Sequence, residues 1–314
     1  MKRVQVMLSV LLCLALFAHK ASTEVPETGF KSLFIGHSFF WPFAYGMPDY
    51  VSAAGITGHT QNVITQGGAG GAPEALWNNA AKRAAIQQVL DQGDVELFVM
   101  TYYPTYPSTT GYENWINYAL SKNPTTRFAL ALPWTPYPSS MDAATYASTW
   151  LQFQATEWHG LIDTLRETYP GVDIFSIPYG QSASELRLLL AANNLPDVAN
   201  LQGNAGNSIY IDNLGHPGDI LVDLGRLVWL NALYDVDLTT YSYGPAYNTD
   251  LHLIAQAIMD SHNPSYDAAY HVDADGDRVG DAVDNCPAIT NPDQEPSMFE
   301  PGRGVACEGL PPGC

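Results

Sequence analysis

The stretch Leu33-Phe34-Ile35-Gly36-His37-Ser38 decides the fold of this 314-residue chain. Three apolar residues in a row, stopped by a glycine, are typical of a short strand that is buried on both faces. Pro42 follows closely and suits the first turn of a helix, which we expect to span about 42–54. A buried strand followed by a helix is the first unit of an α/β sheet domain.

The same alternation of strand-like and helix-like segments continues as far as about Leu233. We expect four more strands at 59–65, 96–100, 128–132 and 172–177, and further helices at 74–90, 143–169, 184–192 and 220–234. Strands that lack a polar face and alternate with helices predict a parallel sheet that is covered on both sides. In such a sheet the reacting groups gather on loops at the carboxyl ends of the strands.

The N-terminus has the features of a secretory signal peptide. Lys2 and Arg3 form a short positive region, an apolar run covers 6–18, and the small residue Ala21 precedes a polar segment. The run is about 13 residues long, which is shorter than the roughly 20 residues that cross a bilayer. We therefore expect residues 1–23 to be removed on export, and the mature protein to be secreted or held at the cell surface, with no membrane segment.

The chain is strongly acidic, with a formal net charge of −19. Removal of residues 1–23 would take away three basic residues and no acid. An acidic surface repels the phosphates of nucleic acids and the headgroups of anionic lipids, so neither is an expected partner. The sequence leaves the oligomeric state open.

Cysteines are confined to the two ends of the chain. After Cys13 the next is Cys286, which is followed by Cys307 and Cys314. The long segment between Cys13 and Cys286 contains no cysteine, so its fold does not depend on disulfides. The three late cysteines allow one disulfide in an oxidising compartment and leave one thiol unpaired. Apolar periodicity stops near His262, and Asp, Gly, Pro and Asn dominate from there. We therefore divide the chain into a sheet domain at 31–262 and a tail at 271–314.

Ser38 is the candidate nucleophile of the sheet domain. The turn after the first strand would hold its hydroxyl at the open edge of the sheet, beside a helix N-terminus that favours negative charge. The competing interpretation is that Ser38 only caps the helix. Asp212 and His216 share one short loop before a late helix, and they favour catalysis because a carboxylate can orient an imidazole that takes the serine proton. His37 is a poor base for Ser38, since neighbours on an extended segment point apart.

On these residues, the segment at about 31–234 resembles the SGNH (GDSL-like) hydrolase superfamily. The resemblance rests on the Gly36-His37-Ser38 block, on the glycine cluster at 67–71 and on the late Asp212–His216 block. It implies a flavodoxin-like three-layer α/β/α domain with a Ser–His–Asp triad. The family attacks an ester carbonyl through the serine, forms an acyl-enzyme, and needs no metal or cofactor for catalysis.

Two features depart from the family pattern. The acid usually precedes the histidine by three residues, whereas Asp212 precedes His216 by four and Asn213 occupies the three-residue position, so the orienting residue stays open between them. The family builds its oxyanion hole from the serine N–H, a glycine N–H after the second strand and an Asn side chain after the third. The resemblance implies Gly68 as the glycine. The Asn block is absent, and Thr101 or a tyrosine hydroxyl is the candidate replacement.

Aromatic residues gather on the loops that the sheet would bring to its active edge. They follow the first, third and fourth strands: Phe39, Phe40, Trp41, Tyr102, Tyr103, Tyr106, Trp134 and Tyr137. Exposed aromatic faces suit the apolar faces of sugar rings and also acyl chains, although each of these residues can instead belong to the core. As a group they favour a carbohydrate that carries ester groups, so the expected partner is a small-molecule or glycan ester.

The tail contains an acidic motif between Asp273 and Asp284, with carboxylates at its positions 1, 3, 5, 9 and 12. Calcium takes six to eight oxygen ligands in flexible geometry, and alternating acids together with a backbone carbonyl can supply them. The predicted ligands are Asp273, Asp275, Asp277, Val279 (through its carbonyl), Asp281 and Asp284. We expect a structural Ca²⁺ ion at this motif.

The segment at about 273–294 closely resembles a thrombospondin type 3 repeat. In that family the next repeat supplies the partner cysteine; here that repeat is degenerate, so the resemblance implies Cys307 as the partner of Cys286. A single repeat is typical of a calcium-stiffened spacer rather than an adhesive rod. The sequence thus predicts a secreted SGNH-type serine esterase. Two alternatives stay open, namely a non-catalytic glycan-binding protein on the same scaffold and a calcium-dependent surface or adhesion protein.

Overall fold

The computed structural model describes residues 28–268, 285–289, 291, 295–300 and 302–309. The predicted signal peptide at 1–23 lies outside these residues. So do the predicted calcium ligands, which are Asp273, Asp275, Asp277, Val279, Asp281 and Asp284.

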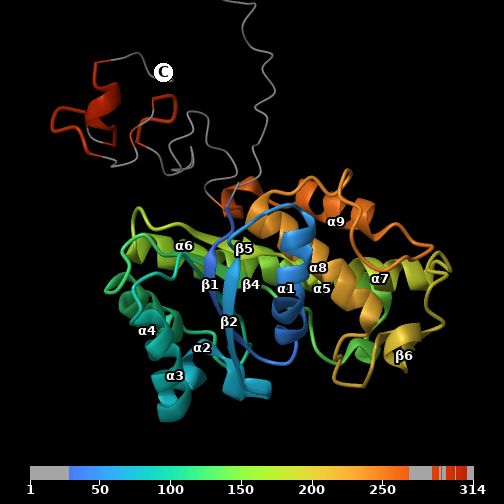
Figure 1. The fold of residues 1–314 in the computed structure, drawn as a ribbon. Coiled ribbons are helices and arrows are strands. Elements are labelled where there is room, and N and C mark those ends of the chain that lie inside the picture. The colour runs from blue at the N-terminus through green and yellow to red at the C-terminus, as the bar shows by residue number, and fades with distance from the viewer. Residues whose placement is uncertain (1–27, 269–284, 290, 292–294, 301, 310–314) are drawn as a thin grey trace, which may run out of the picture.

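A five-stranded parallel sheet forms the centre of the main domain (Figure 1). Its strands are β1 (Lys31–Gly36), β2 (Thr60–Thr65), β3 (Leu97–Thr101), β4 (Arg127–Ala131) and β5 (Ile174–Ile177). They lie in the order β2-β1-β3-β4-β5, which is the flavodoxin-like order. The predicted fold class, a three-layer α/β/α domain around a parallel sheet, is confirmed. Because the strand order reverses between β1 and β3, the carboxyl ends of these two strands flank the place where such sheets bind ligands.

The two faces of the sheet are covered by different helices. Phe34 of β1 meets the ring of Trp229 in α8 (Asp219–Tyr234) edge-on, with centroids 5.7 Å apart. On the other face, Phe98 of β3 contacts Trp115 in α4 (Thr110–Leu120) at 6.3 Å. Helix α1 (Trp41–Ala53) packs against α8, and Arg226 of α8 donates to the Pro42 carbonyl at 2.9 Å. Successive side chains of a strand point to opposite faces, so both faces of the sheet are buried.

The remaining elements refine the expected layout. They are α2 (Pro73–Asn78), α3 (Ala80–Leu90), α5 (Ala143–Phe153), α6 (His159–Thr168), α7 (Gln181–Ala191), α9 (Leu251–Asp260) and the short paired strands β6 (Asn200–Gln202) and β7 (Ser208–Tyr210). The expected helix at 74–90 is in fact two helices. Asn79 has an extended backbone, and its side chain accepts a hydrogen bond from the Lys82 N–H, which starts α3. By contrast, α5 and α6 are joined through a π-helical turn at Gln154–Trp158, so the expected long helix is nearly continuous.

None of the helices in the described part of the chain is both long and apolar enough to span a bilayer.

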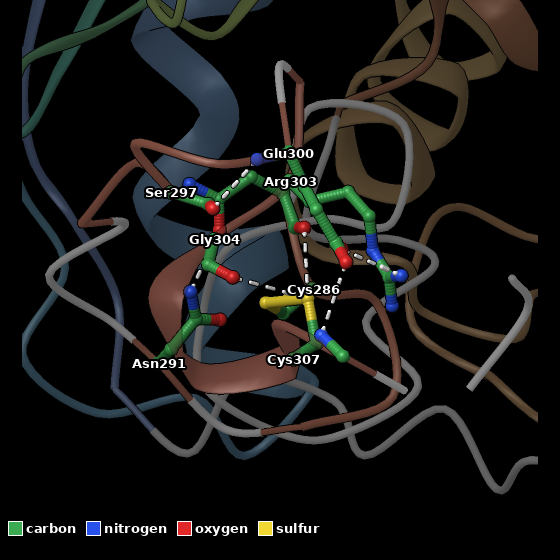
Figure 2. Close-up of a disulfide and its surroundings, with 9 residues drawn as sticks. Cys286, Asn291, Ser297, Glu300, Arg303, Gly304 and Cys307 are labelled. Atoms are coloured by element: carbon green, nitrogen blue, oxygen red, sulfur yellow. Dashed lines mark hydrogen bonds and ion pairs between the residues drawn. A yellow bond between two sulfur atoms is a disulfide. The ribbon is translucent and has the colours of Figure 1, made fainter. Parts of the chain in front are cut away.

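The described residues of the tail fold around a disulfide between Cys286 and Cys307 (Figure 2). The two Cα atoms are 5.6 Å apart, and both side chains are buried. Gly304 lies directly against the bond, since a Cβ atom on it would come within 2.7 Å of the Cys286 sulfur. Asn291 fixes the same region by donating to Asn285 Oδ1 at 2.7 Å. The predicted pairing is therefore present, and Cys314 lies outside the described residues.

Candidate active site

Ser38 occupies a sharp turn between β1 and α1. The N–H groups of Phe40 and Trp41 both donate to the His37 carbonyl, at 3.0 and 3.1 Å, so the chain folds back at once after the strand. The ring of Phe40 fills the space in which a side chain on Gly36 would lie, with Cγ 2.5 Å from a built Cβ position. His37 and Phe39 are buried, whereas Ser38 between them is partly exposed. The turn therefore presents a single hydroxyl at the carboxyl end of the sheet.

His216 reaches this hydroxyl from a loop between β7 and α8. The loop is tight, because Tyr210 pairs with Pro217 across its base and the Ile211 N–H donates to the His216 carbonyl at 2.9 Å. Nε2 of His216 lies 2.8 Å from Ser38 Oγ, and Nδ1 lies 2.6 Å from Asp212 Oδ2. The structure thus brings together all three predicted catalytic residues, although 178 positions separate the serine from the histidine.

The protonation of this chain of groups follows from Asp212. Burial raises the pKa of its carboxyl, but hydrogen bonds from the His216 N–H, the His216 ring and the Gly215 N–H outweigh burial, and the pKa is lowered overall. An ionised carboxylate only accepts, so Nδ1 carries the proton and donates to Oδ2. In the neutral form of the ring that has its proton on Nδ1, Nε2 is an acceptor, and the Ser38 hydroxyl donates to it. This arrangement leaves the imidazole ready to take the serine proton.

The four-residue spacing between acid and histidine is accommodated by the loop itself. Asp212 Oδ1 accepts from the N–H groups of Gly215 and His216 at 2.9 and 3.0 Å, so the carboxylate ties the loop together as well as holding the ring. Gly215 has φ +103°, a value that side chains disfavour. Asn213 is exposed and makes no hydrogen bond to His216 among the described residues. Asp212 rather than Asn213 therefore contacts the imidazole.

Trp134 connects the loop after β4 to the loop that carries His216. Its indole N–H donates to the Gly215 carbonyl at 2.9 Å, and the side chain is 2% exposed. The ring stacks on Phe39 with centroids 4.9 Å apart, and Phe39 meets the His216 imidazole edge-on at 5.2 Å. Phe39, which follows Ser38 in the chain and is held by Trp134, thus packs against the base and restricts where the imidazole can lie.

His37 ties the nucleophile turn to the end of β3. The Phe39 N–H donates to Nδ1 at 3.2 Å, so Nδ1 is unprotonated, and Nε2–H donates to the Tyr102 carbonyl at 3.0 Å. Burial lowers the pKa of His37 to about 4, even though the hydrogen bond to Tyr102 acts in the opposite direction. The imidazole is therefore neutral near pH 7, and it contacts neighbouring backbone rather than the Ser38 hydroxyl.

The two residues predicted for the oxyanion hole lie differently. Thr101 is fully buried with its hydroxyl 3.2 Å from His37 Nε2, which leaves its predicted role as a donor to substrate without support. Gly68 is exposed with φ +55°, and a Cβ atom on it would meet nothing within 4 Å. The glycine packed against the nucleophile turn is Gly71, whose Cβ would lie 2.6 Å from the Gly36 carbonyl oxygen. The role of Gly68 stays a prediction.

The aromatic residues of the active edge divide into two groups. Phe39, Phe40, Tyr102 and Trp134 are buried and form core around the site. Trp41, Tyr103 and Tyr106 are partly exposed, and Tyr137 is 54% exposed. Only the second group can meet a substrate directly. Across the described parts of the chain, no cluster of three or more His, Cys, Asp or Glu side chains is arranged to hold a metal ion.

No protein-family model matches this chain, and no curated protein matches it. Two solved structures resemble it. One is a DUF4886 family protein from Bacteroides uniformis, with 16% identity and a TM-score of 0.48 over 74% of this chain and 95% of that one. The other is the periplasmic domain of a lipopolysaccharide acetyltransferase from Salmonella ser. Paratyphi A, with 13% identity and a TM-score of 0.37 over 65% of this chain and 83% of that one. At these values the likenesses do not bear on the chemistry of the site.

Proposed function

We propose that the sheet domain is a serine ester hydrolase of the SGNH type. The observation that carries the proposal is the unbroken series of hydrogen bonds from Ser38 Oγ through His216 to the Asp212 carboxylate. Serine alone is a weak nucleophile, and a base within hydrogen-bond reach that is itself held by an acid is the arrangement that activates it. A scaffold that only bound glycans would have no need of this arrangement.

In the first half of the reaction, Ser38 Oγ attacks the ester carbonyl carbon while His216 Nε2 takes the hydroxyl proton. Asp212 stabilises the imidazolium that forms. The tetrahedral intermediate then collapses, the bond to the alcohol oxygen breaks, and Nε2 returns its proton to that oxygen. The products of this half are a free alcohol and an acyl group on Ser38.

In the second half, water replaces the alcohol. His216 Nε2 takes a proton from a water molecule as its oxygen attacks the acyl carbonyl carbon, and the same proton then passes to Ser38 Oγ as the acyl bond breaks. A carboxylic acid leaves and the serine is restored. The oxyanion of both intermediates needs donors fixed in place, and the Ser38 N–H beside the N-terminus of α1 is the donor that this turn itself offers.

We propose an acylated carbohydrate as the substrate class. Exposed or partly exposed aromatic side chains lie at the start of α1 and on the loops after β3 and β4, and such rings suit the apolar faces of sugars. The strong negative charge of the chain makes polyanionic substrates unfavourable.

The proposal extends to the place of action and to the tail. A disulfide is typical of an oxidising compartment, which supports export of the chain after removal of residues 1–23. The aspartates at 273–284 are hard oxygen ligands in the number and spacing that calcium prefers, which supports a structural Ca²⁺ site in the thrombospondin type 3-like segment. No step of the ester chemistry depends on this ion.

The test is turnover of p-nitrophenyl acetate together with labelling by a fluorophosphonate probe. Wild type is expected to be active and labelled, and Ser38→Ala to lose both. Ser52→Ala replaces an exposed serine in α1 and serves as the matched control. Absence of turnover and of Ser38-dependent labelling in wild type would refute the esterase and favour the glycan-binding alternative, which binding to glycan arrays would then reveal.

A further inference from the structure

Tyr137 is held in an unusual position beside the candidate site. It follows β4, is 54% exposed, and has φ 57° and ψ 58°, which is the left-handed region. A bulky side chain rarely adopts this backbone conformation, and such outliers concentrate where a protein contacts its ligands. Exposure of a large ring on a constrained backbone sets Tyr137 apart from the buried aromatics Phe39 and Trp134.

The loop of Tyr137 is joined directly to the loop that carries His216. The Tyr137 N–H donates to the Leu214 carbonyl at 3.0 Å, and Pro138 lies so close to Gly215 that a Cβ atom there would be 3.0 Å from Pro138 Cδ. Leu214 is itself 38% exposed. The backbone hydrogen bond therefore joins two loops that each carry an exposed side chain, Tyr137 on one and Leu214 on the other, and Leu214 stands two residues before the base.

The proposed reaction determines which part of the substrate lies beside His216. His216 Nε2 must return its proton to the alcohol oxygen, so the departing alcohol has to lie next to the imidazole. Residues beside His216 that face outward are then in position to meet the alcohol portion of the ester.

We propose that Tyr137 and Leu214 form a binding platform for the alcohol portion, and that this alcohol carries a neutral ring with an apolar face, such as a sugar. The proposal rests on the esterase function stated above. An aromatic ring and an aliphatic side chain together match the apolar face of a pyranose. Asp212, whose side chain is 44% exposed on the same loop, carries a negative charge that disfavours an anionic sugar.

The experiment compares two acetate esters of primary alcohols that differ in the ring alone, ethyl acetate and the 6-O-acetyl ester of methyl glucoside. Release of acetate gives kcat/KM for each. Tyr137→Ala is expected to lower the ratio of the sugar ester to the ethyl ester by about threefold to tenfold, the size of one lost aromatic contact. Tyr137→Phe keeps the ring and should retain the ratio. Tyr45→Ala, which replaces a comparably exposed tyrosine on α1, is the matched control.

Separate measurement of acylation and deacylation gives a second test of the platform. The alcohol has already left when the acyl-enzyme is hydrolysed, so the loss must fall on acylation, which single-turnover measurements separate from deacylation. An unchanged ratio in Tyr137→Ala, or an equal loss in deacylation, would overturn the platform while leaving the esterase intact. If the wild-type protein hydrolyses neither ester and is not labelled at Ser38, the proposed esterase function is itself refuted.

Discussion

Asp212 holds His216 at two points, with Oδ2 2.6 Å from the ring Nδ1 and Oδ1 3.0 Å from the backbone N–H of the same residue. One carboxylate therefore fixes the tautomer of the imidazole and also the loop on which it stands. This contact does not need the acid to stand three residues before the histidine. The loop between Asp212 and His216 holds one more residue, and it turns at Gly215, which has a positive φ.

Replacement of Asp212 by asparagine is expected to reduce kcat for ester hydrolysis by roughly 10³- to 10⁴-fold, because a neutral amide does not stabilise the imidazolium and can select the wrong tautomer. Asn213→Ala is the matched control, since that side chain is exposed and has no hydrogen bond to His216 in the described structure. Steady-state kinetics on p-nitrophenyl acetate give the comparison. A greater loss of kcat in Asn213→Ala than in Asp212→Asn would mean that Asn213, and not Asp212, orients the imidazole.

Trp134→Phe removes the indole N–H that donates to Gly215 and keeps a ring against Phe39. We expect kcat to fall about tenfold with little change in KM, because the base loop loses one anchor while the substrate surface is kept. The free energy of unfolding should fall by about 1 kcal/mol.

Trp150→Phe provides the control for Trp134→Phe. Its buried indole N–H also donates to a backbone carbonyl, that of Pro133, at 3.0 Å. Urea unfolding should show a similar loss of stability in both variants, with the loss of kcat confined to Trp134→Phe. Equal effects on kcat would mean that stability rather than positioning explains the result.

His37 gives the fold a defined dependence on pH. Its pKa is lowered by burial to about 4, against an ordinary value of 6.5. Between these values the unfolded chain binds a proton that the folded chain does not, so this residue makes stability fall as the pH falls from 6.5 to 4, by roughly 3 kcal/mol in total.

Urea unfolding of wild type and His37→Gln at pH 7, 5.5 and 4.5 measures this contribution. The difference in unfolding free energy between the two proteins should shrink as the pH is lowered, because only wild type loses the contribution of His37. The comparison isolates His37 from His262, whose pKa burial also lowers to about 4, since both proteins retain His262. A constant difference across the three pH values would contradict the neutral, buried imidazole.

Calcium is expected to bind the acidic motif of the tail. Titration calorimetry should show heat of binding in the full chain, and Asp275→Asn combined with Asp277→Asn should abolish it, because two carboxylate ligands lose their charge. Calcium at 100 times its Kd would stabilise a folded site by about 2.7 kcal/mol, which limited proteolysis between 269 and 284 would detect as protection. Asp260→Asn, at the end of α9, is the control outside the motif. Binding that survives the double substitution would place the ion elsewhere.

The sequence predicted the sheet well because most of its strands contain short buried apolar runs, such as Leu33–Ile35 and Phe98–Met100, although β2 is more polar and partly exposed. It missed two helices, α4 and α9. In α4, Tyr112, Trp115, Ile116 and Ala119 are buried at helical spacing. The prolines before α4 favoured a long loop, and the aromatic content weakened the helical pattern.

The sequence predicted the reacting groups of the site but not the residues that hold them in position. Ser38, Asp212 and His216 stand in recognisable local patterns on the chain. The hydrogen bond between Trp134 and Gly215 joins residues 81 positions apart, so no local pattern contains it. The choice among the four glycines at 67–71 depended on how that segment folds, and the close approach of Gly71 to the Gly36 carbonyl arises only from tertiary packing.

The Cys286–Cys307 bond lies wholly within the last thirty residues, and no cysteine occurs between Cys13 and Cys286. A reductant such as dithiothreitol can therefore break the Cys286–Cys307 bond in the tail, whereas the sheet domain contains no cysteine. Ester hydrolysis should then be insensitive to thiols in the buffer, and the sheet domain should reach its native form in a reducing host cell. Recovery of an intact C-terminal end would require oxidising conditions during purification.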